Sequence, residues 1–140
     1  SYANVAGSLT RVGVAFLGCG ARAQAHLHRV LQLGSAGEGV RVAGVCDVWD
    51  GLEDEWVQQR GATATRRRYS QGRVTKEYRR LLDRTDVDAV CVATPDHWHA
   101  RMTLDALAAG KDVLVERPLA RTPEEVAAVR AAAAATGRVV

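Results

Sequence analysis

Short, almost wholly apolar runs alternate along the chain with longer stretches in which apolar residues follow helical spacing. The apolar runs predict strands at 11–17, 40–46, 89–94 and 112–116. Strands that are apolar on both faces are typical of a buried parallel sheet, in which helices connect successive strands. The pattern therefore predicts an α/β domain with a parallel sheet.

The stretches between these runs predict helices with recognisable ends. Residues 24–33 have helical spacing after a glycine turn, and residues 97–109 lead into Gly110, a typical helix end. Residues 122–125 read Thr-Pro-Glu-Glu, with a capping Thr, Pro at the first helical position and Glu three residues after the cap. We expect that last helix to end at Gly137.

Four further segments complete the expected order. Residues 52–60 predict a helix, 64–69 a third strand at the sheet edge because of its arginines, and 75–83 a short helix. Residues 138–140 are expected to begin a sixth strand.

The domain organisation follows from this alternation. Residues 1–10 show no periodicity and are expected to form an N-terminal arm. Residues 11–140 suit one domain, a doubly wound parallel sheet with strand order 3-2-1-4-5-6, which is the Rossmann fold.

A glycine turn follows the first strand and immediately precedes a helix. In Gly18-x-Gly20-x-x-Ala23, the first glycine permits the tight turn and the second permits close approach of a pyrophosphate. The third position must be small so that the helix can pack on the strand. Because a helix N-terminus also presents free N–H groups, we expect a dinucleotide here; the candidate residues are Gly18, Gly20, Ala21, Arg22 and Ala23.

Asp47 follows the second strand, where the adenosine ribose of a dinucleotide would lie. A carboxylate at this point accepts hydrogen bonds from ribose hydroxyls and repels a 2′-phosphate, which favours NAD. The plainer interpretation is an ordinary acidic turn residue. NADP stays an alternative, because the arginines at 66–68 offer positive charge for a 2′-phosphate.

The fourth strand ends in a polar and aromatic cluster, Thr94-Pro95-Asp96-His97-Trp98-His99. Ligands of doubly wound sheets bind near the ends of the first and fourth strands, so this cluster is well placed. Alternatively, Asp96 caps the helix and the histidines lie at the surface. We expect no metal site, because His97 and His99 are two residues apart and do not share a helix face.

The composition limits the possible partners. Hydrophobic residues make up 47% and charged residues 25%, as in ordinary globular proteins, and the net charge is only +3. Only Tyr69 accompanies the arginine run, so nucleic-acid binding is not supported, and no apolar run is long enough to cross a membrane. The three cysteines cannot all pair and are expected to be reduced, buried thiols.

Several segments from Arg11 onward resemble the N-terminal domain of the glucose–fructose oxidoreductase / inositol dehydrogenase / MocA (Gfo/Idh/MocA) family: GCGARAQAH, VCDVWD, YRRLLDRTDVDAVCVATPDHWH and AGKDVLVERPLARTPEE. The resemblance implies a nicotinamide cofactor on the glycine turn, with Asp47 on the adenosine ribose. It also implies that the ribose and nicotinamide side is lined by Thr94, Pro95, His97 and His99. Glu116, at the end of the fifth strand, is a further candidate cofactor contact.

Two departures from the family pattern bear on activity. Members usually have Glu-Lys-Pro after the fifth strand, and their lysine assists proton transfer, whereas this chain has Glu116-Arg117-Pro118. Arg117 keeps the charge at that catalytic position but does not deprotonate in the useful pH range. Members also carry a second domain with most substrate contacts, which we expect to be absent from this chain.

The leading expectation is the NAD-binding domain of an oxidoreductase that acts on sugar- or cyclitol-like alcohols, catalytically incomplete alone. The alternatives are an NAD-dependent glycosidase of the same family and a non-catalytic cofactor-sensing or interaction module. We expect a homodimer through the exposed sixth-strand edge. The cysteine usage favours the cytoplasm, while the leader 1–12 resembles the spacer after a removed twin-arginine signal in exported relatives.

Overall fold

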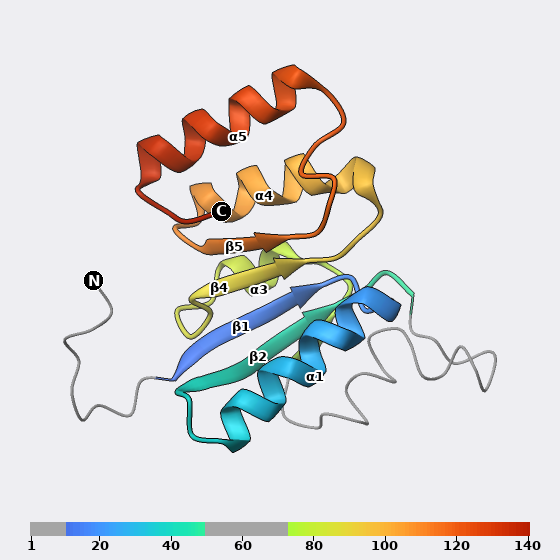
Figure 1. The fold of residues 1–140 in the computed structure, drawn as a ribbon, viewed down its shortest axis with the longest axis vertical. Helices are drawn as coiled ribbons and strands as arrows, with labels where there is room; N and C mark the ends of the chain where they lie inside the picture. The colour runs from blue at the N-terminus through green and yellow to red at the C-terminus, as the bar shows by residue number, and fades with distance from the viewer. Residues whose placement is uncertain (1–10, 50–72) are drawn as a thin grey trace.

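The computed structural model describes residues 11–49 and 73–140 (Figure 1). Several expectations lie outside these residues: the arm at 1–10, the helix at 52–60, the strand at 64–69 and the arginine run at 66–68. No helix within the described ranges is long and apolar enough to cross a membrane.

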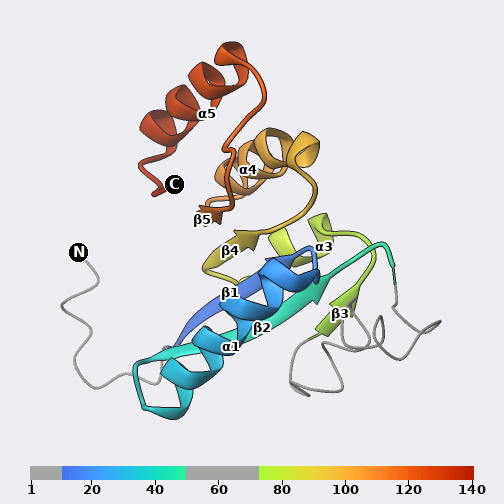
Figure 2. The ribbon, with the colours of Figure 1, turned by 45° about the vertical axis from the view of Figure 1, so that its right-hand side comes forward.

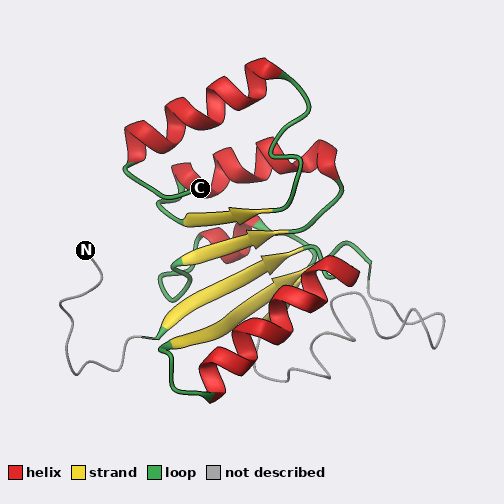
Figure 3. Ribbon diagram, viewed as in Figure 1, coloured by secondary structure: helices red, strands yellow, loops and turns green. Residues whose placement is uncertain are grey.

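The described part of the chain forms a parallel sheet of five strands in the order β3-β2-β1-β4-β5. This confirms the predicted doubly wound fold, with β1 at the point where the strand order reverses. Figure 3 shows the strands running side by side with their carboxyl ends at one edge. The strands are β1 (Val12–Leu17), β2 (Val40–Cys46), β3 (Arg73–Thr75), β4 (Ala89–Val92) and β5 (Asp112–Val115).

Helices cover both faces of the sheet, as the two views in Figures 1 and 2 show. One face carries α1, and the other carries α3 and α4, with α5 beside α4. A short 3₁₀ turn, η3 (Asp96–Trp98), precedes α4. The helices are α1 (Ala21–Ser35), α3 (Arg79–Leu82), α4 (His99–Ala108) and α5 (Pro123–Thr136).

Successive side chains of β1 enter two different hydrophobic clusters. Leu17 packs with residues of α4 such as Leu107, whereas Phe16 packs with Leu27 of α1. All of these side chains are buried. Burial on both faces explains why β1 is an uninterrupted apolar run in the sequence rather than an alternating one.

The last helix begins and ends as the sequence predicts. The Thr122 hydroxyl accepts a hydrogen bond from the N–H of Glu125 at 3.2 Å, and Pro123 is the first helical residue. Gly137 ends the helix with φ of 64°, a left-handed conformation that glycine adopts without strain.

Two elements differ from expectation. The third strand of the sheet is β3, which takes Thr75 from the start of the expected helix and leaves α3 only four residues, Arg79–Leu82. The expected sixth strand is not formed by residues 138–140. Val139 accepts one backbone hydrogen bond from Val113, at 2.8 Å, while its own N–H donates to the Asp112 side chain.

The three cysteines are buried thiols, as expected. Burial raises the pKa of the Cys46 thiol to about 12, with a further contribution from the negative charge of Asp47. Burial likewise raises the pKa of Cys91 to about 12. A thiol with a raised pKa is a weak nucleophile at neutral pH.

Candidate functional site

Gly18 ends β1 in a conformation that only glycine adopts easily. Its φ is 87°, and a Cβ atom there would lie 2.7 Å from the carbonyl oxygen of Ala93 after β4. The N–H of Gly18 donates to the carbonyl of Cys46 at 2.8 Å. This residue therefore brings the ends of β1, β2 and β4 together, and its glycine is required by the fold itself.

Gly20 is a glycine for a different reason. Its φ of −69° is an ordinary value, and a Cβ atom there would meet nothing within 4 Å. Neither the backbone conformation nor the packing of this chain demands glycine at this position. The open space lies over the start of α1, where a side chain would stand between a ligand and the backbone.

The first turn of α1 offers free hydrogen-bond donors. Gly20 is the N-cap residue, no side chain caps the helix, and the first turn contains no acidic residue. The N–H of Gln24 is bonded to the carbonyl of Gly20, so the N–H groups of Ala21, Arg22 and Ala23 precede the first helical bond. Such an uncapped N-terminus attracts an anion, and these donors suit the diphosphate of a dinucleotide.

The Asp47 carboxylate is fixed by two backbone donors. Its Oδ2 atom accepts a hydrogen bond from the N–H of Cys19 at 2.8 Å, and its Oδ1 atom accepts one from Trp49 at 3.0 Å. An ionised carboxylate has about four acceptor positions, so both oxygens can still accept from a ligand. The structure thus places the predicted ribose-binding acid directly beside the glycine turn.

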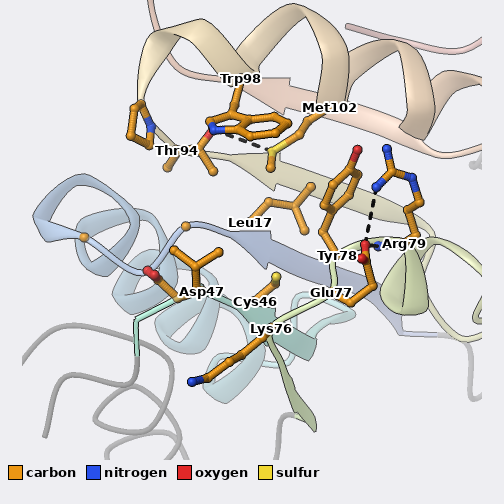
Figure 4. A pocket seen from close by; sticks show the side chains of 15 residues that line it. Leu17, Cys46, Asp47, Lys76, Glu77, Tyr78, Arg79, Thr94, Trp98 and Met102 are labelled. Carbon is orange, nitrogen blue, oxygen red and sulfur yellow. Dashed lines mark hydrogen bonds and ion pairs between the residues drawn. The ribbon is translucent and has the colours of Figure 1, made fainter.

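A cavity of about 560 Å³ opens at the carboxyl ends of β1, β2, β3 and β4. Figure 4 shows Asp47 on one side, Trp98 and Met102 above, and Tyr78 opposite Asp47. Of the predicted site residues, the lining includes Gly18, Gly20, Asp47, Thr94 and Pro95. Trp98 of the predicted fourth-strand cluster lines it too, whereas the sequence pattern did not point to Val48, Lys76, Glu77, Tyr78, Arg79 and Met102.

Tyr78 is held in the wall of this cavity by α4. Its hydroxyl donates to the Asp105 carboxylate at 2.5 Å, and Arg79 donates to the same oxygen at 2.9 Å. Burial and the hydrogen bond to Asp105 together raise the pKa of Tyr78 to about 12. The sequence did not point to Tyr78 as a lining residue because its place depends on the pairing of β3 with β2, which joins residues that are distant along the chain.

The two histidines of the fourth-strand cluster are separated. His97 is exposed, while His99 is buried, and neither lines the cavity. The His99 ring lies between two carbonyl oxygens, that of Pro118 at 2.7 Å from Nδ1 and that of Thr94 at 2.8 Å from Nε2. His99 therefore holds the end of β4 against the turn after β5 and positions the cavity residue Thr94.

Glu116 connects the end of β5 to α1. Its Oε1 atom accepts a hydrogen bond from Nε of Arg22 at 3.0 Å and contacts Nε2 of His26. The hydrogen bond with His26 and the positive charge of Arg22 keep the pKa of Glu116 below its usual value. The carboxylate is thus engaged with α1 rather than directed into the cavity, and the exposed Arg117 does not line the cavity either.

A family model described as "Oxidoreductase family, NAD-binding Rossmann fold" (Gfo/Idh/MocA) matches residues 12–140. An alpha-N-acetylgalactosaminidase of Shewanella oneidensis is 36% identical over 126 residues. That match covers 86% of this chain and 26% of the relative. The chain thus spans about a quarter of the length of this curated relative.

Two solved structures resemble the fold closely. GenD2 from gentamicin A biosynthesis, solved in complex with NAD, has a TM-score of 0.76 and 31% identity, and the match covers 94% of this chain and 34% of GenD2. The WlbA dehydrogenase of Chromobacterium violaceum, solved with NADH and UDP-GlcNAcA, has a TM-score of 0.74 and 25% identity. The latter match covers 94% of this chain and 35% of WlbA.

Proposed function

The chain belongs to the Gfo/Idh/MocA oxidoreductase family, as its NAD-binding Rossmann domain, and from this premise we propose where and how it holds the cofactor. The diphosphate of NAD(H) lies over the first turn of α1, and the adenosine lies in the cavity beside Asp47. The observation that carries this proposal is the open space at Gly20, which lies above a helix N-terminus that no side chain caps.

Each residue of the proposed site has a distinct role. The N–H groups of Ala21, Arg22 and Ala23 donate to the diphosphate, because they precede the first hydrogen bond of α1. Asp47 accepts hydrogen bonds from the ribose hydroxyls with the acceptor positions that Cys19 and Trp49 leave open. When bound, the nicotinamide supplies hydride transfer.

Thr94 and Pro95 form the wall of the cavity at the end of β4. His99 keeps them there through its contact with the carbonyl of Thr94 and does not itself touch the ligand. Glu116 holds Arg22 against the end of β5, which fixes the first turn of α1 relative to the sheet. In this proposal the residues after β5 therefore support the diphosphate site indirectly.

The proposed reaction of the larger protein is oxidation or reduction of a hydroxyl group on a sugar- or cyclitol-like substrate. The solved WlbA relative, crystallised with NADH and a sugar nucleotide, supports this class of substrate. An NAD-dependent glycosidase is the alternative, favoured by the alpha-N-acetylgalactosaminidase relative. Because the chain spans only about a third of the solved relatives, most substrate contacts are expected outside it.

The test of cofactor binding is a fluorescence titration of the chain with NADH, with S-adenosylmethionine as the comparison ligand. We expect saturable NADH binding and no binding of S-adenosylmethionine, which a different class of Rossmann-like protein would prefer. Absence of saturable NADH binding up to millimolar concentration would contradict the proposal. A non-catalytic cofactor-sensing module would bind NADH equally but would not transfer hydride in the larger protein.

We also propose that two copies associate along β5, the last strand of the described sheet. Leu114 of this strand is 58% exposed, and in this proposal its side chain is buried in the contact between the two copies. Light scattering at high micromolar concentration is the test. A dimer mass that falls when Leu114 is replaced by Lys supports the proposal, and a monomer mass for the unmodified chain contradicts it.

A further inference from the structure

Lys76 lies directly beside Asp47 at the carboxyl edge of the sheet. Cys46 of β2 pairs with Thr75 of β3, and the N–H of Asp47 donates to the carbonyl of Thr75 at 3.3 Å. Asp47 and Lys76 are the next residues on these two neighbouring strands, whose backbones are about 5 Å apart. Both residues line the same cavity, and in Figure 4 the Lys76 side chain lies below Asp47 and extends toward the lower left.

The Lys76 ammonium group is available to a ligand. Its side chain is exposed and has no hydrogen bond or ion pair within the described parts of the chain. The charged residues that follow it are engaged differently. Glu77 contacts Arg79, and Arg79 also donates to Asp105 of α4. Two cationic residues, Lys76 and Arg79, are among the described residues that line the cavity. Arg79 is paired with carboxylates, and Lys76 is not.

The two side chains have opposite consequences for the 2′ position of the adenosine ribose. A carboxylate accepts hydrogen bonds from a 2′-hydroxyl and repels a 2′-phosphate. A lysine ammonium attracts a phosphate and donates charge-assisted hydrogen bonds to it. The balance between Asp47 and Lys76 thus bears directly on discrimination between the two nicotinamide cofactors.

We propose that Lys76 is a specificity-determining residue that contacts the 2′-phosphate of NADP(H). It limits how strongly the Asp47 site rejects that cofactor. The proposal rests on the proposed NAD(H) site and adds a residue that the sequence analysis did not consider. The sequence also offered the arginines at 66–68 as partners for the 2′-phosphate, and these lie outside the described residues.

The test compares the dissociation constants of NADH and NADPH for the unmodified chain and for Lys76→Met. Loss of one charge-assisted hydrogen bond corresponds to a shift of about tenfold in the affinity ratio, toward NADH. Arg80→Gln is the matched control, because Arg80 is exposed, close in sequence and absent from the cavity wall. An equal shift in both variants would indicate only a long-range effect of net charge and would overturn the proposal.

The same comparison in the Asp47→Asn background removes the repulsion and makes NADPH binding easier to measure. There we expect Lys76→Met to lower NADPH affinity more than NADH affinity, and the difference to shrink at high salt because phosphate–lysine attraction is screened. An unchanged NADPH-to-NADH ratio, or no measurable NADPH binding in this background, would overturn the role of Lys76. If the unmodified chain bound neither cofactor, the proposed function itself would fail, which is a distinguishable result.

Discussion

The N–H of Cys19, in the middle of the glycine turn, donates a 2.8 Å hydrogen bond to the carboxylate of Asp47. The bond joins the turn after β1 to the residue after β2, 28 positions later in the chain. Because the turn faces the diphosphate and Asp47 faces the ribose in the proposed site, this bond fixes the spacing between the two subsites.

We predict that the chain binds NADH more tightly than NADPH and that Asp47→Ala weakens NADH binding by about 1–3 kcal/mol, through lost hydrogen bonds to the ribose. Fluorescence titration measures both effects. Asp86→Ala is the control, since Asp86 pairs with Arg84 and Arg41 away from the cavity. Equal affinity of the unmodified chain for the two cofactors would contradict the assignment of Asp47.

We predict that Gly20→Val abolishes NADH binding without unfolding the chain. The new side chain enters open space, so it obstructs the ligand and nothing else. Gly18→Val provides the contrast, because its Cβ would lie 2.7 Å from the carbonyl of Ala93 at a φ of 87°. Circular dichroism and urea unfolding should show destabilisation for Gly18→Val only, and normal NADH binding by Gly20→Val would exclude this turn as the phosphate site.

We predict that His99→Phe lowers the free energy of unfolding by about 1–3 kcal/mol, since the carbonyl groups of Thr94 and Pro118 lose their ring partner. His97→Phe is the matched control at a side chain that is 53% exposed. Urea unfolding measures both variants. Equal stability of the two would show that His99 does not hold the ends of β4 and β5 together.

We predict that Glu116 contributes to the acid dependence of stability. Its folded-state pKa is lowered from 4.5, so its contribution is complete above that value and is lost as the pH falls through the lower folded-state pKa. Glu116→Gln should therefore make the free energy of unfolding less dependent on pH below 4.5. Urea unfolding at several acidic pH values tests this, with Glu38→Gln as the control for removing one exposed carboxylate.

We predict that the 140-residue chain reduces no NAD with sugars or inositols, even at saturation. Hydride transfer requires a positioned substrate, and such positioning is worth about 7–11 kcal/mol in well-oriented reactions. Arginine is also a poor general base, so the residue at position 117 is not suited to accept the hydroxyl proton. Arg117→Lys alone should not produce activity, and NAD reduction by the isolated chain above a heat-killed control would refute the prediction.

The sequence by itself determined the class of fold and the position of the glycine turn between β1 and α1. These depend on local features: uninterrupted apolar runs such as β1, the glycines at Gly18 and Gly20, and the Thr122 cap of α5. Strand and helix signals of this kind are contained within a few neighbouring residues, so they are readable without knowledge of the fold. The family model that matches residues 12–140 agrees with that interpretation.

Only the tertiary structure decided which polar residues share the cavity. His97 and His99 are two residues apart in sequence, yet the His97 ring in η3 is exposed and the His99 ring at the start of α4 is buried. Lys76 and Asp47 line the same cavity because β3 pairs with β2 in a register that aligns Thr75 with Cys46. Strand register joins residues that are distant along the chain, and the local pattern of hydrophobic and polar positions therefore does not encode which of them meet.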